Sequence, residues 1–120
     1  MSSSLFSFLS PPCPFRRGGK IELPSRKTCT ENIVVYTVNE GALARLAEAS
    51  ASMDAFLATR PGFIRRVVLR DASVPRRFTD LVDWASLEEA QQASLAAENE
   101  KSVEAFVLSI ETIVIASHFQ

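Results

Sequence analysis

The stretch spanning residues 78–90 limits the fold of this chain more than any other segment. Its first seven residues, FTDLVDW, are mostly aromatic, aliphatic or β-branched and predict a β-strand. Trp84, the only tryptophan, ends that strand. Ser86 then stands in the position of a helix N-cap, and Glu89 three residues later completes a capping box. The stretch therefore predicts a strand that runs almost directly into a capped helix.

The residues before this stretch predict the first half of a similar arrangement. Residues 33–38 are β-branched and aromatic and indicate a strand. Residues 42–59 follow the spacing of one buried helix face, which includes Ser50, and an Arg-Pro-Gly turn ends this helix. Residues 63–70 predict a second strand, and the polar segment 71–77 joins it to the next strand as a hairpin.

The last third of the chain again predicts a helix followed by a strand. Residues 87–97 are rich in alanine and predict a helix. The charged run that follows predicts a break or kink near Asn99, and Ser102 is the expected cap of a second helical segment. Residues 112–119 predict the final strand.

The resulting order, β-α-β-β-α-β, predicts an α+β domain of ferredoxin-like topology. Two βαβ halves joined by a hairpin give a four-stranded antiparallel sheet with both helices on one face. The first and last strands carry apolar side chains on both faces, yet two helices cover only one. On a monomer the other face would be an exposed apolar patch. The pattern therefore predicts a homodimer packed sheet on sheet.

The first 30 residues differ from the rest in charge. They carry a net charge of +4, against −5 for residues 31–120. The segment is rich in serine and its first acid is Glu22, as in an organelle-targeting peptide. A disordered extension, or residues upstream of the natural start, fits equally well. We therefore expect a domain at 31–120 and a cytoplasmic protein, or alternatively one targeted to an organelle through residues 1–30.

Composition excludes several classes of function. The net charge of −1 argues against general binding of nucleic acid or a membrane surface, and no apolar run reaches the length of a membrane span. Cys13 and Cys29 form a disulfide or remain free thiols, because no further metal ligands accompany them. Phosphate-binding glycine loops, metal-spaced His/Cys sets and a nucleophile elbow are absent. We expect no metal and no cofactor.

Five side chains are candidates for chemistry. Trp84 could stack on an aromatic ligand, and His118, the only histidine, is the natural proton acceptor at neutral pH, unless it is a solvent-exposed strand end. Tyr36 could hydrogen-bond a ligand. Asp80 shares a strand face with Trp84 and could be a base or the partner of Arg65. That face belongs either to a pocket under the helices or to the dimer interface, and alternation alone leaves both open.

Strand alternation also divides the basic residues of the predicted hairpin. It places Phe63 and Arg65 on one face of the second strand and Arg66 on the other. With three further arginines nearby, the cluster indicates either anion recognition or charge that protects an edge strand from unwanted pairing. The second interpretation is favoured, because no aromatic residues are interleaved with the arginines.

Residues 31–120 resemble the antibiotic-biosynthesis-monooxygenase-like family of the dimeric α+β barrel superfamily. The resemblance rests on FLATRPGF at 56–63, FTDLVDWASLEEAQ at 78–91 and IVIASHF at 113–119. It implies a dimer whose two sheets form a barrel, with a pocket between each sheet and its own helices. The fold hosts many activities, so the resemblance constrains the chemistry less than the architecture.

The resemblance also implies two kinds of chemistry. Some members oxidise polycyclic aromatic phenols without a cofactor, and an asparagine and a tryptophan recur in their pockets; Trp84 matches the tryptophan. Haem-degrading members bind iron through a histidine near the position of Ser94, where this chain has none. We therefore expect a homodimer that binds a small aromatic or apolar molecule. It is either a cofactor-independent monooxygenase, with Trp84 and Arg65 binding substrate and His118, Asp80 and Tyr36 catalytic, or a non-catalytic binding or scaffold dimer.

Overall fold

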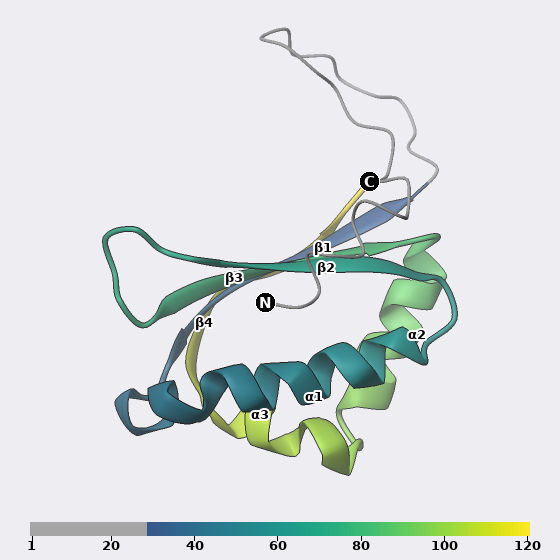
Figure 1. Cartoon of the computed structure of the whole chain (residues 1–120). Coiled ribbons are helices and arrows are strands. Elements are labelled where there is room, and N and C mark those ends of the chain that lie inside the picture. Colours follow the sequence, from purple (N-terminus) through teal and green to yellow (C-terminus); the bar gives the residue numbers. More distant parts are fainter. Residues whose placement is uncertain (1–28) are drawn as a thin grey trace, which may run out of the picture.

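The structure, a computed structural model, describes residues 29–120. The predictions for Cys13 and for a targeting or disordered leader lie outside those residues. Four strands form one antiparallel sheet in the order β2-β3-β1-β4, and the helices lie on one side of it (Figure 1). This confirms the predicted ferredoxin-like α+β fold. The strands are β1 (Thr30–Val38), β2 (Phe63–Arg70), β3 (Arg77–Trp84) and β4 (Ile110–Phe119).

The helices begin differently from the prediction. The helix expected at 42–59 starts as a 3-10 helix, η2 (Glu40–Arg45), and becomes α-helical only in α1 (Leu46–Ala58). Helix α2 (Leu87–Ala97) is capped by Ser86, whose Oγ accepts a hydrogen bond from Glu89 N at 3.1 Å, as predicted. The expected break follows it, and the chain continues through η3 (Lys101–Val103) into α3 (Glu104–Leu108). Glu100, rather than the predicted Ser102, caps that segment through its side chain.

A β-bulge at the start of β2 changes which side chains share a face. The pairing with β3 shifts register between Phe63 and Arg65, because a bulge adds one residue to one strand. Phe63 therefore packs edge-on against Trp84, with ring centroids 5.7 Å apart, on the helix-facing side. Arg66 also faces the helices. The predicted grouping of Phe63 with Arg65 is thus wrong, since simple alternation takes no account of a bulge.

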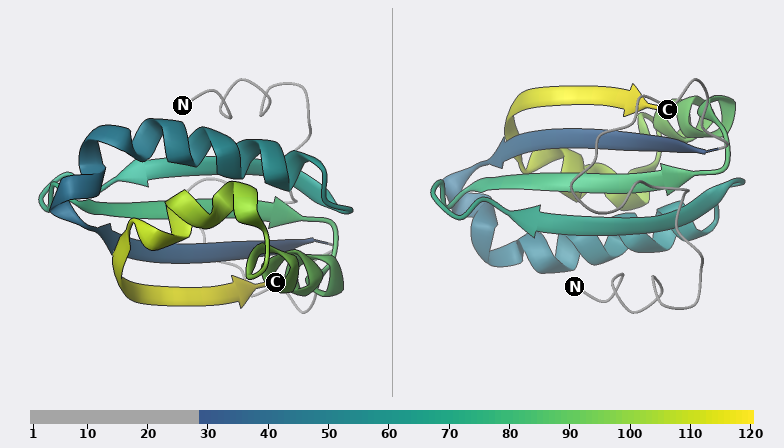
Figure 2. Two further views of the ribbon diagram at one scale, coloured as in Figure 1. Left: turned by 90° about the horizontal axis from the view of Figure 1, so that it is seen from below. Right: turned by 90° about the horizontal axis from the view of Figure 1, so that it is seen from above.

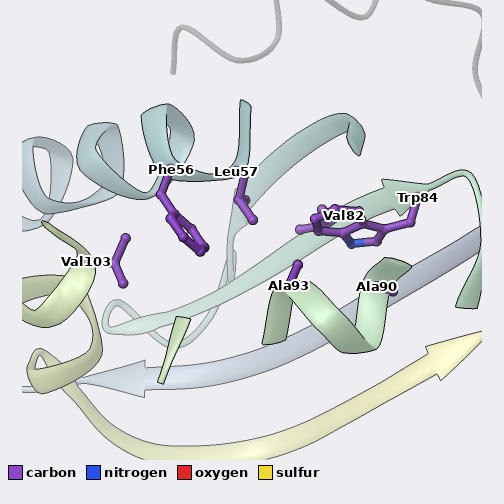
Figure 3. Packing of buried hydrophobic residues seen from close by; sticks show 7 residues of the cluster. All are labelled: Phe56, Leu57, Val82, Trp84, Ala90, Ala93 and Val103. Atoms are coloured by element: carbon purple, nitrogen blue, oxygen red, sulfur yellow. The ribbon is translucent and has the colours of Figure 1, made fainter. Parts of the chain in front are cut away.

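The core between sheet and helices has two parts. One lies near the end of β3 and joins Trp84 and Val82 to α1 and α2; Figure 3 shows its members Phe56, Leu57, Val82, Trp84, Ala90, Ala93 and Val103. The other contains Tyr36, Val38, Leu46, Phe78 and Phe106. The two parts lie along the same helix-facing surface of the sheet, and the candidate site lies between them.

The opposite face of the sheet carries half-exposed apolar side chains. Leu69, Thr79, Val35 and Ile115 lie in one row across the four strands, and Leu69 and Ile115 are 51% and 48% exposed. Figure 2 (right) looks onto this side of the sheet. Arg65 and Asp83 form an ion pair here at 2.8 Å.

Candidate functional site

A cavity of about 180 Å³ lies between the sheet and the helices. Its walls are mostly apolar, and four polar side chains, Asn32, Tyr36, Asp80 and Ser94, also line it. A mostly apolar pocket with a few convergent polar groups is the usual form of a small-molecule site. The remaining lining residues are Val34, Met53, Leu57, Val82, Trp84, Ala93, Ala97, Phe106, Val107 and Ile110.

Trp84 is both a wall of this cavity and part of the core. Its side chain faces the helices, so of the two positions left open by sequence it takes the pocket and not the outer sheet face. It is only 2% exposed. Its Nε1 is buried and has no hydrogen-bond partner among residues 29–120. Phe63 holds the indole from the side in a T-shaped contact, which fixes the ring as a flat apolar surface.

The polar groups of the cavity belong to a buried network centred on Asp80. Tyr36 donates a hydrogen bond from its hydroxyl to Asp80 Oδ1 at 2.7 Å. Arg66 donates to Asp80 Oδ2 from Nε at 3.1 Å and from Nη2 at 2.8 Å. The Arg66 side chain is fully buried, and the Asp80 side chain is 10% exposed. Asp80 is therefore a carboxylate with three donors on two oxygens, facing an apolar cavity.

Arg66 also connects the sheet to helix α1. Its Nη1 donates to Asp54 Oδ1 at 2.7 Å, to Ser50 O at 3.0 Å and to Ser50 Oγ at 2.9 Å. The guanidinium lies over the Phe106 ring, 5.3 Å from its centroid, so α3 covers the remaining side. All three guanidinium nitrogens therefore have partners within the protein.

These contacts shift the protonation of two groups. Burial raises the pKa of Tyr36 far above its ordinary value, the charge and hydrogen bond of Asp80 raise it further, and Arg66 opposes this weakly. Burial alone would lower the pKa of Arg66, but the charges and hydrogen bonds of Asp80 and Asp54 raise it above its ordinary value. Tyr36 thus stays a hydroxyl donor, and Arg66 stays a cation.

Two predicted site residues lie elsewhere. Arg65, the expected partner of Asp80, is on the outer face and pairs with Asp83; the partner of Asp80 is Arg66, because the bulge turns that side chain toward the helices. His118 lies on β4 opposite Asn32, on the helix-facing side but not among the residues that line the cavity. The structure thus brings together Trp84, Tyr36 and Asp80.

Sequence reasoning missed several members of the site. The sequence pattern places neither Arg66 nor Asp54 in the site. One signal was available, because Ser50 is a polar residue in the buried stripe of α1 and so indicates a buried polar partner. Asn32 proves to share the cavity with Trp84, and Ser94 lines it from α2. Phe106 closes the network over Arg66. Nothing in the spacing of these residues along the chain indicates that they meet.

Other kinds of site find no support in the described part of the chain. No three His, Cys, Asp or Glu side chains among residues 29–120 come together to hold a metal ion. In the same range, no helix has the length and apolar character needed to cross a membrane.

A ferredoxin-like sheet with a mostly apolar, tryptophan-walled cavity under its helices defines a class of small α+β proteins. The family model of the antibiotic biosynthesis monooxygenases matches residues 31–107, and the chain belongs to that family. Comparison with curated protein sequences gives no significant match.

Several solved structures share the fold. A candidate antibiotic biosynthesis monooxygenase from Bordetella bronchiseptica superposes with a TM-score of 0.68 at 18% identity, covering 78% of this chain and 96% of the other. SnoaB, a cofactor-independent oxygenase from Streptomyces nogalater, gives 0.66 at 22% identity over 78% and 92% of the two chains. A candidate antibiotic biosynthesis monooxygenase from Nitrosomonas europaea gives 0.67 at 17% identity over 81% and 93%. At these identities the likeness establishes the fold.

Proposed function

We propose that the cavity beneath Trp84 binds a small phenolic substrate, which the protein oxidises with molecular oxygen without a cofactor. The observation that carries this proposal is the position of Asp80. It is a buried carboxylate whose hydrogen-bonded oxygens face an apolar cavity walled by an indole. Family membership and the resemblance to SnoaB, itself a cofactor-independent oxygenase, support the same reaction class.

The size of the cavity limits the substrate. A cavity of about 150 Å³ holds one benzene ring, and this one measures about 180 Å³. A single aromatic ring fits inside it, flat against Trp84. A second ring would extend toward Val107 and Ile110, which line the cavity from α3 and β4. We therefore expect phenols of one or two rings to bind better than larger polycyclic ones.

The charges in the wall favour a neutral hydroxyl donor. Asp80 is an anion, and the hydrogen-bond donors of Arg66 are already directed at Asp80, Asp54 and Ser50. A carboxylate on the ligand would lie beside the Asp80 anion and be repelled, since no free cation among the described residues that line the cavity is available to offset the two negative charges. A phenol can instead donate its hydroxyl to Asp80 while its ring packs on Trp84.

The reaction needs no external reductant. A phenol with a free para position and one O₂ give a para-quinone and one H₂O. One oxygen atom enters the ring, the other leaves as water, and the substrate supplies all four electrons. Asp80 accepts the hydroxyl proton as electron density moves to O₂, and Tyr36, held protonated, donates to the same carboxylate. Trp84 and Asn32 orient the ring, and His118, opposite Asn32, is the second candidate acceptor.

Oxygen uptake with a panel of naphthols, quinols and anthrones tests this proposal. Asp80→Asn should lower kcat about 100-fold, the range of a lost general base. Asp54→Asn is the matched control, because Asp54 also binds Arg66 but does not line the cavity; its activity should stay within about threefold of wild type. His118→Ala separates the two candidate acceptors, since activity survives this change if Asp80 is the base. Equal activity of Asp80→Asn and wild type contradicts the assignment.

A non-catalytic binding or scaffold dimer is the second candidate. It is favoured by the completeness of the network, because Arg66 and both oxygens of Asp80 are already paired, as a purely structural core requires. Saturable binding of naphthols without oxygen uptake by any panel member would select this function.

We also propose that a second copy of the chain covers the outer face of the sheet. The row Leu69–Thr79–Val35–Ile115 would form the centre of that interface, because its ends are half-exposed apolar side chains. Light scattering should give twice the chain mass of 13.2 kDa. Ile115→Asp should yield the monomer, whereas Leu95→Asp, which changes a similarly exposed residue of α2 (58%), should leave the dimer intact. A monomeric wild type at micromolar concentration would show the proposal to be wrong.

A further inference from the structure

A second cavity lies at the opposite end of the sheet–helix interface from Trp84. It measures about 270 Å³ and is lined by Tyr36, Leu43, Leu46, Ala47, Ser50, Val68, Arg70 and Phe78. In Figure 1 this is the end where β2 and β3 are joined, above the start of α1. The Tyr36 side chain lines both cavities, so its ring stands between them.

The lining of this second cavity is mostly apolar, with two hydroxyl side chains, Tyr36 and Ser50, and one charged group, Arg70. Leu46 and Phe78 are buried, and Leu43 and Val68 are partly buried. Ala47 and Arg70 are the exposed members and therefore mark the mouth. The cavity thus offers apolar walls to the body of a ligand and one cation at its opening, which is a different chemistry from the anionic wall beneath Trp84.

Arg70 is held in place by contacts that leave its terminal nitrogens unused. Its Nε donates to Pro75 O at 2.8 Å, and its guanidinium lies over the Phe78 ring, 5.3 Å from the centroid. Among residues 29–120, Nη1 and Nη2 have no hydrogen-bond or ion-pair partner. A guanidinium positioned in this way is prepared to bind a carboxylate through two parallel hydrogen bonds.

We infer that this cavity is a second small-molecule site, for an aromatic monocarboxylate. The ring system would lie against Leu46, Val68 and Phe78, and the carboxylate would bind Arg70 at the mouth. Since about 150 Å³ holds one benzene ring, the larger volume here accommodates a two-ring body. The inference does not rest on the oxygenase proposal, because neither Trp84 nor Asp80 lines this cavity and Tyr36 is the one described residue that lines both.

Binding of 2-naphthoate, with neutral 2-naphthamide as its isosteric partner, tests the inference. Titration of the full chain should show the acid binding more tightly than the amide. Arg70→Gln should weaken binding of the acid about tenfold, the effect of losing a charge-assisted pair, and leave the amide unchanged. Ala47→Phe, which fills the mouth from an exposed helix position, should abolish binding of both. Arg45→Gln, an exposed arginine of η2 outside the cavity, should change neither by more than about twofold.

Amide chemical shifts locate the bound acid. They should move at Leu46, Val68 and Phe78, while the single Trp84 indole N–H signal stays in place. Equal affinity for acid and amide, equal weakening by Arg45→Gln and Arg70→Gln, or shifts centred on Trp84 would each overturn the assignment.

Discussion

Replacing Arg66 with methionine should destabilise the fold by about 3–5 kcal/mol, the cost of removing one partner of a buried ion pair. The substitution keeps an unbranched side chain of similar reach but takes five hydrogen bonds away from Asp80, Asp54 and Ser50. Asp80, which is 7% exposed as a whole residue, would remain a buried carboxylate with Tyr36 as its only partner. The loss of Arg66 affects Asp54 less, because its side chain is 19% exposed and its carboxylate can be hydrated.

Urea unfolding followed by the fluorescence of Trp84 measures this effect at fixed protein concentration. The double variant Arg66→Met/Asp80→Asn should recover part of the loss, because it removes the stranded charge while the amide oxygen still accepts from Tyr36. Arg76→Met is the control: it removes a largely exposed pair with Glu111 and one hydrogen bond to Val38 O, and should cost no more than about 1–2 kcal/mol. If the double variant is no more stable than Arg66→Met alone, the loss of stability is not caused by the unpaired charge of Asp80.

The fold was predictable because it depends on patterns within short segments. The β-branched residues of β1, the spacing of α1, the Ser86 cap and the break near Asn99 each signal a local structure. The order of these elements along the chain is compatible with only a few topologies. The shared face of Trp84 and Asp80 also follows from the two-residue period of a strand, whereas the choice between pocket and interface depends on the register between strands.

The polar part of the site was not predictable from those patterns. Arg66 reaches Ser50 and Asp54, which lie 16 and 12 residues away on another element, and the bulge before it alters the alternation of β2. A charged residue in a strand ordinarily indicates a side chain that faces solvent. Its burial here depends on three partners that meet only in the folded chain. The sequence pattern therefore suggests Arg65 as the partner of Asp80, although Arg65 lies on the opposite face of the sheet.

Trp84→Ala should be the most damaging single change in the apolar core, with a loss of about 3–5 kcal/mol in the free energy of unfolding. The indole is 2% exposed and packs on Phe63, Val82 and the alanines of α2. Its removal leaves a large cavity that backbone shifts can fill only in part. Circular dichroism must follow the unfolding, since the variant has no tryptophan.

Added indole separates the two roles of Trp84, filling the core and walling the substrate cavity. Indole at millimolar concentration should raise the Tm of Trp84→Ala by several degrees more than it raises the Tm of wild type, because a ligand that binds only the folded state stabilises it and only the variant has the space that the lost side chain leaves. Trp84→Phe should keep an aromatic wall and cost less than Trp84→Ala. If Trp84→Ala with indole regains stability but still fails to bind naphthol, the indole must be anchored to β3 for the pocket to function. If Trp84→Ala binds naphthol as tightly as wild type without added indole, Trp84 is a core residue and no part of the substrate site.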